Sequence, residues 1–131
     1  MLSEDVHRTA MLALAAWKEA RGESWLGKLA VCQTIENRVA DSRWPGSYEG
    51  VILQPKQFSA FNPGDPNQDE WPELTDASYL DCLDAARLVL EDPHDFAEGA
   101  NHYHALYIQP PDWAVNKKPV LTLGNHVFYK L

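Results

Sequence analysis

Apolar residues recur at helical spacing through the first third of the chain and predict two helices separated by a break at Gly22. The first helix spans residues 5–20, with Ser3 or Asp5 as its cap. Ser24 can cap the second, which ends near residue 39. The residues expected on the buried side of the first helix are Val6, Ala10, Leu14 and Trp17. Those of the second are Leu29, Cys32, Ile35, Glu36 and Val39, in which Glu36 is a polar residue at a position expected to be buried.

The middle of the chain predicts a short helical turn, a long irregular loop and a third helix. The turn covers residues 50–53, and several prolines break any regular pattern in residues 57–74. A loop of this length in a compact domain usually has a function. Thr75 or Asp76 can cap the third helix, which runs to about residue 91, where a proline stops it. The residues expected on its buried side are Tyr79, Leu83, Ala86 and Leu90.

The last third of the chain has patterns typical of strands. Polar and aromatic residues alternate in residues 101–108, and two short strands, 120–123 and 126–129, flank Gly124-Asn125. This arrangement predicts a β-hairpin or a small sheet. The fold class is therefore α+β and mainly helical, with a small C-terminal β element, and residues 1–131 are predicted to form a single domain.

Charge and composition narrow the classes of partner. The net charge is −8, and the absence of any run of lysines or arginines argues against a nucleic-acid partner. No stretch approaches the roughly 20 apolar residues of a membrane span, so no membrane insertion is expected. The short N-terminal apolar stretch follows acids rather than basic residues, which disfavours a signal peptide. Five tryptophans and five tyrosines, together with many carboxylates and amides, suit a carbohydrate site.

The two cysteines, Cys32 and Cys82, lie in predicted helices and form no CxxC pair. A zinc knuckle or a thioredoxin-like redox motif is therefore not expected. They can be bridged if the two helices pack together, or they can be core thiols. Their spacing does not decide between these states.

The densest polar cluster lies at the junction of the first two helices and contains Glu19 and Glu23. A glutamate at the end of an apolar helix is partly desolvated, which raises its pKa toward the range of a general acid. Glycoside cleavage requires such an acid to protonate the leaving oxygen. The alternative is a solvated helix end with two exposed carboxylates four residues apart.

Two further clusters offer polar groups. Gln57 and Ser59 follow a proline and can position a sugar by directional hydrogen bonds, or they belong to a polar surface loop. His102 and His104 share one face of a predicted strand. With His126 from a neighbouring strand they reach the ligand count of a catalytic zinc site, although the chain has no HExxH motif.

Together these clusters resemble the cell-wall hydrolases of the spore cortex-lytic enzyme type (SleB/CwlJ-like). The matching segments occur in the family's order and span nearly the whole chain. They are Glu19-Ala-Arg-Gly-Glu23, Val31 to Asn37-Arg38-Val39, Gln54 to Gln57-Phe58-Ser59, Gly99-Ala-Asn-His102-Tyr103-His104, Trp113, and Gly124-Asn-His126-Val-Phe128-Tyr129.

The resemblance implies a lysozyme-like, mostly helical fold that acts on the glycan strands of peptidoglycan without a metal or an organic cofactor. It implies that Glu19 is the catalytic acid/base, and a monomer is expected. The residues expected to bind substrate are Glu23, Gln57, Phe58, Ser59, His102, Tyr103, His104, Trp113, His126 and Tyr129.

Family members that resemble this chain act as lytic transglycosylases or as muramidase-like enzymes. A lytic transglycosylase needs one carboxylate, because the muramic acid 6-hydroxyl attacks its own anomeric carbon and gives a 1,6-anhydro product. A muramidase needs a second carboxylate. The loop of residues 62–72 offers Asp65, Asp69 and Glu70 for that role.

Two alternatives remain beside the glycosidase. One is a metal-dependent amidase or peptidase that uses His102, His104 and His126, and the other is a non-catalytic glycan-binding module. The glycosidase prediction also includes a biological role. A single-domain wall hydrolase without a signal peptide resembles a phage or prophage endolysin, stored in the cytoplasm and released to the wall by a holin.

Overall fold

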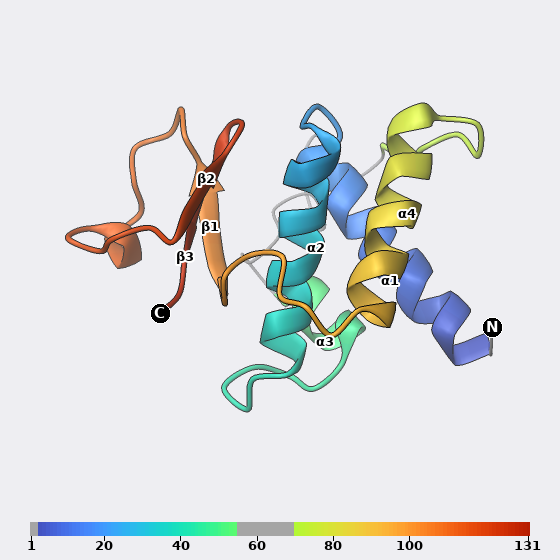
Figure 1. Cartoon of the computed structure of the whole chain (residues 1–131), viewed down its shortest axis with the longest axis horizontal. Helices are drawn as coiled ribbons and strands as arrows, with labels where there is room; N and C mark the ends of the chain where they lie inside the picture. Colours follow the sequence, from blue (N-terminus) through green and yellow to red (C-terminus); the bar gives the residue numbers. More distant parts are fainter. Residues whose placement is uncertain (1–2, 55–69) are drawn as a thin grey trace.

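The computed structural model describes residues 3–54 and 70–131, which form a helical part and a small sheet (Figure 1). None of the helices in these residues has the length and apolar character needed to cross a membrane. The elements, in chain order, are α1 (Ser3–Ala20), α2 (Trp25–Val39), α3 (Tyr48–Ile52), α4 (Ala77–Glu91), β1 (His102–Ala105), the 3-10 helix η2 (Asp112–Ala114), β2 (Leu121–Leu123) and β3 (His126–Tyr129).

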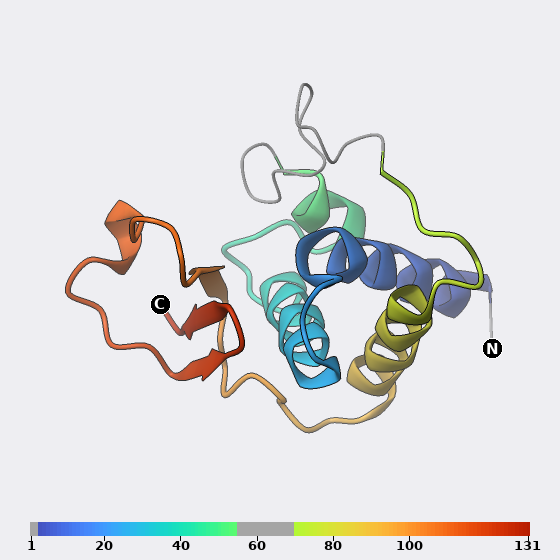
Figure 2. The same cartoon turned by 90° about the horizontal axis from the view of Figure 1, so that it is seen from above.

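Helices α1, α2 and α4 pack side by side, and the sheet lies beyond α2 on the side away from α4 (Figures 1 and 2). The strands are antiparallel in the order β1-β3-β2. The predicted hairpin around Gly124-Asn125 is confirmed as β2 and β3, and β1 extends it into a sheet. The expected class, mainly helical with a small C-terminal sheet, is therefore confirmed.

Side-chain caps fix the starts of three helices. Ser24 caps α2 by accepting the Gly27 N–H at 3.3 Å. Asp76, rather than Thr75, caps α4 by accepting the Tyr79 N–H at 2.9 Å. Ser47 caps α3, which therefore begins at Tyr48, before the predicted turn. Each cap satisfies an N–H that has no partner within the helix.

The buried side of α1 differs from the predicted one. Val6 is 52% exposed and Ala10 is also exposed. The fully buried residues are Leu12, Ala13, Ala15 and Ala16, together with nearly buried Trp17 and Ala20. An alanine-rich helix has no single apolar stripe, because alanine fits either face. The small side chains let α2 and α4 approach closely, and this contact decides which face is buried.

The sheet has two distinct faces, which are set by the register of its strands. Tyr103 lies opposite Phe128 and His104 lies opposite Val127, so their side chains alternate between the faces. The inner face carries Phe128, which is fully buried in the helical core. The outer face carries Val127 and Tyr129 in a smaller apolar cluster with Ala114 of η2. Tyr103 is therefore directed toward the helices.

Both cysteines are free and buried, Cys32 on α2 and Cys82 on α4. Burial raises the pKa of the Cys82 thiol to about 12 and also raises that of Cys32. A thiol with a raised pKa is a poor nucleophile. Both residues therefore pack as small apolar side chains in the core.

Candidate active site

Glu19 lies in the last turn of α1, half-buried at the junction of the helices and the sheet. The Tyr103 hydroxyl donates a hydrogen bond to Glu19 Oε1 at 2.7 Å. Burial, and then the adjacent Glu19 carboxylate, raise the pKa of Tyr103 well above its usual value, so the hydroxyl keeps its proton and acts as the donor. A hydrogen bond from a buried donor to a carboxylate is among the stronger ones in proteins.

Arg38 brings a buried positive charge to the same junction. Its side chain is 5% exposed, and its Nε donates to the Asn101 carbonyl at 2.6 Å. The guanidinium also lies 5.3 Å from the centre of the Trp44 ring. Burial lowers the pKa of Arg38, whereas electrostatic interactions with Tyr103 and Glu19 act to raise it. The electrostatic influence of Arg38 therefore reaches both members of the Glu19–Tyr103 pair.

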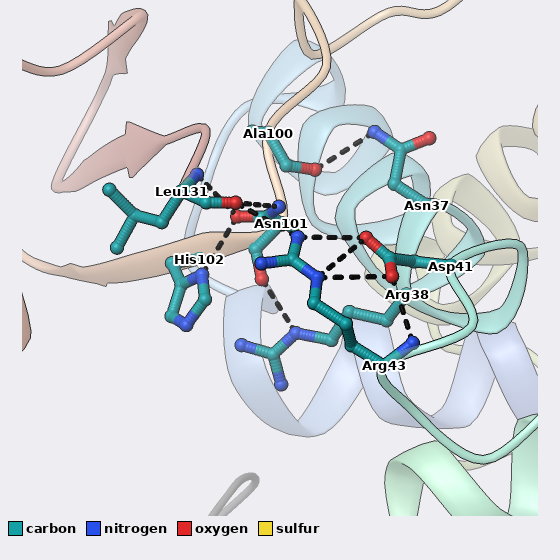
Figure 3. Close-up of polar contacts among 8 residues, drawn as sticks. All are labelled: Asn37, Arg38, Asp41, Arg43, Ala100, Asn101, His102 and Leu131. Carbon is teal, nitrogen blue, oxygen red and sulfur yellow. Dashed lines mark hydrogen bonds and ion pairs between the residues drawn. The ribbon is translucent and has the colours of Figure 1, made fainter.

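Asn101 accepts a hydrogen bond from Arg38 and is itself held by hydrogen bonds to β3 and to Leu131 (Figure 3). Its backbone N–H donates to the Tyr129 carbonyl at 2.9 Å. Its side-chain amide donates to the Leu131 carbonyl at 3.0 Å and accepts the Leu131 N–H at 2.9 Å. The same Oδ1 lies 2.8 Å from His102 Nδ1, which must donate because an amide oxygen only accepts. Every hydrogen-bonding group of Asn101 in this network has a partner.

Arg43 and Asn37 extend the network around the end of α2 (Figure 3). Arg43 Nη2 donates to Asp41 Oδ2 at 2.8 Å and to the Leu131 carbonyl at 2.9 Å. The hydrogen bonds from Arg43 lower the pKa of Asp41 to about 2. Asn37 donates to the Ala100 carbonyl at 2.8 Å. These bonds fix Ala100, next to Asn101 at the start of β1, and Leu131, to which Asn101 is hydrogen-bonded.

Glu23 faces the turn between β2 and β3 rather than Glu19. Its Oε1 accepts the Asn125 backbone N–H at 2.7 Å, and its Oε2 accepts the Asn125 side-chain amide at 3.1 Å. His126 Nδ1 lies 3.5 Å from Oε1. Helix α1 ends at Ala20, so Glu19 lies on the helix whereas Glu23 lies in the turn that follows it. Glu23 therefore makes its contacts to protein groups of the hairpin.

The outer face of the sheet gathers four of the residues predicted to bind substrate: His102, His104, Trp113 and Tyr129. His104 Nδ1 donates to the Ala105 carbonyl at 2.9 Å, so its Nε2 accepts from the Tyr129 hydroxyl at 3.1 Å. Burial, and then the charges of Arg38 and Arg43, lower the pKa of His102 to about 4. His102 therefore stays neutral at neutral pH, and both histidines make structural contacts within this cluster.

The alternative of a three-histidine zinc site is contradicted by the register of the sheet. His102 and His104 share the outer face, but His126 pairs with Ala105 in the register and lies on the inner face against the Tyr103 ring. The sheet itself separates the third imidazole from the other two. In residues 3–54 and 70–131, no group of three or more histidine, cysteine or acidic side chains is placed to hold a metal ion.

The structure thus brings together three of the predicted site residues, Glu19, Tyr103 and His126, on the inner side of the sheet. The predicted residues Gln57, Phe58 and Ser59, and the acids Asp65 and Asp69, lie outside the described residues.

Trp71 is 63% exposed, with Lys18 Nζ 4.3 Å from its ring centre. Arg38 and Asn101 occur in the segments that carry the family resemblance, but the sequence pattern indicates no chemical role for either. The sequence does contain an indication for Arg38, because this charged residue continues the helical spacing of the buried positions Val31 and Ile35.

Comparison with solved structures shows the same fold in two catalytic domains. One is the catalytic domain of the Bacillus cereus SleB protein, 28% identical, with a TM-score of 0.74 over 99% of this chain and 93% of that domain. The other is the catalytic domain of the germination-specific lytic transglycosylase SleB from Bacillus anthracis, 26% identical, with a TM-score of 0.76 over 99% and 97%. The fold is therefore lysozyme-like, as the resemblance implied.

Sequence comparison gives the family. A spore cortex-lytic enzyme of Bacillus cereus is 30% identical over 129 residues, which cover 92% of this chain and 43% of the relative. One from Oceanobacillus iheyensis is 31% identical over 125 residues, covering 92% and 40%. The chain thus spans less than half the length of these relatives. The cell wall hydrolase family profile matches residues 22–129. The chain belongs to the cell wall hydrolase family.

Proposed function

We propose that this chain cleaves the glycan strand of peptidoglycan between N-acetylmuramic acid and N-acetylglucosamine, with Glu19 as the acid and then the base. Membership of the cell wall hydrolase family supports the substrate class. The structural neighbour from Bacillus anthracis, which bears the name lytic transglycosylase, supports the type of reaction. The observation that carries the proposal is the 2.7 Å hydrogen bond from the Tyr103 hydroxyl to Glu19 Oε1, at a half-buried helix end.

In the first step, Glu19 protonates the oxygen that joins the two sugars, and the glycosidic bond breaks as positive charge develops at the anomeric carbon. The Glu19 carboxylate that results is stabilised by the Tyr103 hydrogen bond and by the nearby charge of Arg38. The departing sugar leaves with the proton on its hydroxyl.

In the second step, the Glu19 carboxylate takes the proton of the muramic acid 6-hydroxyl. The 6-oxygen then bonds to the anomeric carbon of the same sugar, which gives the 1,6-anhydro ring and restores protonated Glu19. The attacking group belongs to the same sugar, so it acts at a high effective concentration. One carboxylate is sufficient for this sequence.

The muramidase alternative needs a second carboxylate that activates water. Glu23 is occupied by the Asn125 amides, which disfavours it for that role. Glu70 is exposed, and Asp65 and Asp69 lie outside the described residues. Mass spectrometry of digested peptidoglycan separates the two reactions, because an anhydro product is lighter by one water than a product with a reducing end. We expect anhydro-muropeptides.

The central test is Glu19→Gln, which removes the transferable proton and keeps the size of the side chain. We expect a loss of at least about 1000-fold in the release of muropeptides from purified peptidoglycan, a scale set by the removal of general acid catalysis. The matched control is Glu91→Gln, which changes an exposed glutamate in the last turn of α4. Glu91→Gln should retain wild-type activity. Normal clearing of peptidoglycan by folded Glu19→Gln would overturn the proposal.

The proposal extends to an endolysin role, in which the enzyme stays in the cytoplasm until a holin releases it to the wall. The test is expression of the full chain in a susceptible host with and without a holin, followed by measurement of turbidity. Lysis that depends on the holin would support this role. Rapid lysis without a holin would contradict it.

A further inference from the structure

The carboxylate of Glu23 accepts two hydrogen bonds from the turn of the β2–β3 hairpin. Its two oxygens accept the backbone and side-chain N–H groups of Asn125, at 2.7 and 3.1 Å. The Glu23 side chain is only 9% exposed, although it follows a helix end next to solvent-exposed Gly22. A carboxylate buried to this degree is stable where it is hydrogen-bonded on both oxygens. Glu23 therefore fixes the hairpin against the turn between α1 and α2.

The hairpin turn is shaped to receive this carboxylate. Gly124 has a φ of +54°, and a Cβ atom added there would lie 2.8 Å from Glu23 Oε1. A side chain at this position would be strained by its backbone conformation and would also collide with the carboxylate. The absence of a side chain thus allows the turn to approach Glu23 closely.

The same hairpin leads back to the proposed catalytic group. His126 follows the turn, and its Nδ1 lies 3.5 Å from Glu23 Oε1. The edge of its ring packs on the Tyr103 ring, with the centres 5.1 Å apart and the planes at 69°. Tyr103 in turn donates to Glu19 Oε1 at 2.7 Å. Glu23 and Glu19 are therefore linked by a continuous chain of contacts through the inner face of the sheet.

We propose that Glu23 is a positioning residue for the reaction, which acts through Asn125, His126 and Tyr103 to orient Glu19. This inference rests on the proposed role of Glu19. It assigns Glu23 neither to the substrate nor to a second catalytic carboxylate. The hairpin held by Glu23 sets the position of the His126 ring, and the His126 ring limits where the Tyr103 hydroxyl can lie.

The first test measures the contact between Glu23 and His126 without any reaction. The titratable groups that face His126 are Glu23 from the α1–α2 turn and Tyr103 from β1, and His104 acts on it from the other face of the sheet. Burial lowers the pKa of His126, Glu23 acts to raise it, and His104 lowers it. Glu23→Gln should therefore lower the pKa of His126 further, as measured by NMR of the imidazole. An unchanged His126 titration would refute the link.

The second test is a double-mutant cycle on the full chain with Glu23→Gln and Tyr103→Phe. A shift of about an ångström in a catalytic group costs up to about 100-fold in rate, so we expect Glu23→Gln to lower kcat by about 10- to 100-fold with KM unchanged. If Glu23 acts through Tyr103, Glu23→Gln should cause no further loss of kcat in the Tyr103→Phe background. Equal losses in both backgrounds would overturn the inference.

Controls separate this result from misfolding and from failure of the proposed function. Tyr107→Phe changes a tyrosine that is 81% exposed in the same part of the chain and should not alter kcat. Asn125→Ala removes the side-chain amide that donates to Glu23 Oε2 and keeps the backbone N–H. It should lower kcat, as Glu23→Gln does. An active Glu19→Gln would show that the proposed function fails. An inactive Glu19→Gln with an additive cycle would show that only this inference fails.

Discussion

Glu19 and Glu23 are four residues apart, yet α1 ends between them and each reaches a different element of the sheet. Glu19 meets Tyr103 of β1, and Glu23 meets the β2–β3 turn. Arg38 lies near the first glutamate, where it favours the carboxylate form that the proposed reaction produces. The chemistry assigned to Glu19 thus depends on a buried cation as well as on a hydrogen-bond donor.

The role of Arg38 can be tested by Arg38→Lys, which keeps the charge and removes the planar guanidinium. Lysine cannot reproduce the 2.6 Å bond from Nε to the Asn101 carbonyl together with the contact on Trp44. Loss of a hydrogen bond made by a charged group costs about 1.5–3 kcal/mol, so we expect a fall of this size in the free energy of unfolding, measured with urea. We also expect a lower kcat on purified peptidoglycan.

Arg87→Lys is the matched control, since Arg87 is exposed on α4 and lies 3.8 Å from Glu91. Exposed ion pairs of this kind contribute little to stability, so both measurements should stay near wild type. If Arg38→Lys proved as stable and as active as Arg87→Lys, the buried hydrogen bond of Arg38 would contribute to neither stability nor catalysis.

At the scale of elements, the start of α4 illustrates how a cap is chosen. Thr75 and Asp76 are both good capping residues, and Asp76 accepts the Tyr79 N–H at 2.9 Å. We expect Asp76→Ala to lower the free energy of unfolding by about 1 kcal/mol in a urea titration. Thr75→Ala should have a much smaller effect. Equal effects of the two substitutions would mean that the cap is not at Asp76.

The hydrophobic pattern predicted the principal helices and the hairpin because each has a strong local signal. Ser24 and Asp76 cap their helices as expected, and Gly124-Asn125 lies in the predicted turn. The pattern failed for the buried face of α1, because alanines do not distinguish two sides of a helix. Only the packing of α2 and α4 against α1 makes that choice.

The candidate site was predictable in part, for a similar reason. The position of Glu19 at a helix end could be predicted from the sequence, because the helix and its break at Gly22 are local features. The hydrogen bond from Tyr103 joins residues 84 positions apart and depends on the sheet register. That register also places His126 on the face opposite His102 and His104. The alternation of residues within one strand does not show which face it shares with a neighbouring strand.

At the scale of the whole molecule, the sheet is attached to the helices by both apolar and polar contacts. Phe128 enters the helical core, and the Asn101 network ties the end of α2 to β1 and β3. Glu19 and Tyr103 come from opposite sides of this junction. The geometry of the proposed site is therefore sensitive to how firmly the two parts are held together.

His102 makes this attachment sensitive to pH. Burial, and then Arg38 and Arg43, lower its pKa from 6.5 to about 4 in the folded protein. The unfolded chain therefore binds a proton below about pH 6.5, whereas folded His102 stays neutral down to about pH 4. The contribution of neutral His102 to the free energy of unfolding should thus be fully present above pH 6.5 and lost as the pH falls to about 4.

His102→Gln isolates this effect, because glutamine can still donate to Asn101 Oδ1 but does not titrate. Urea unfolding of wild type and variant should be measured between pH 7 and pH 4. The free energy of unfolding of wild type should fall more steeply than that of His102→Gln over this range, since other groups titrate equally in both proteins. Parallel pH profiles would contradict the prediction. A variant with the shallower profile would identify His102 as the group through which acid loosens the junction that holds Tyr103 on Glu19.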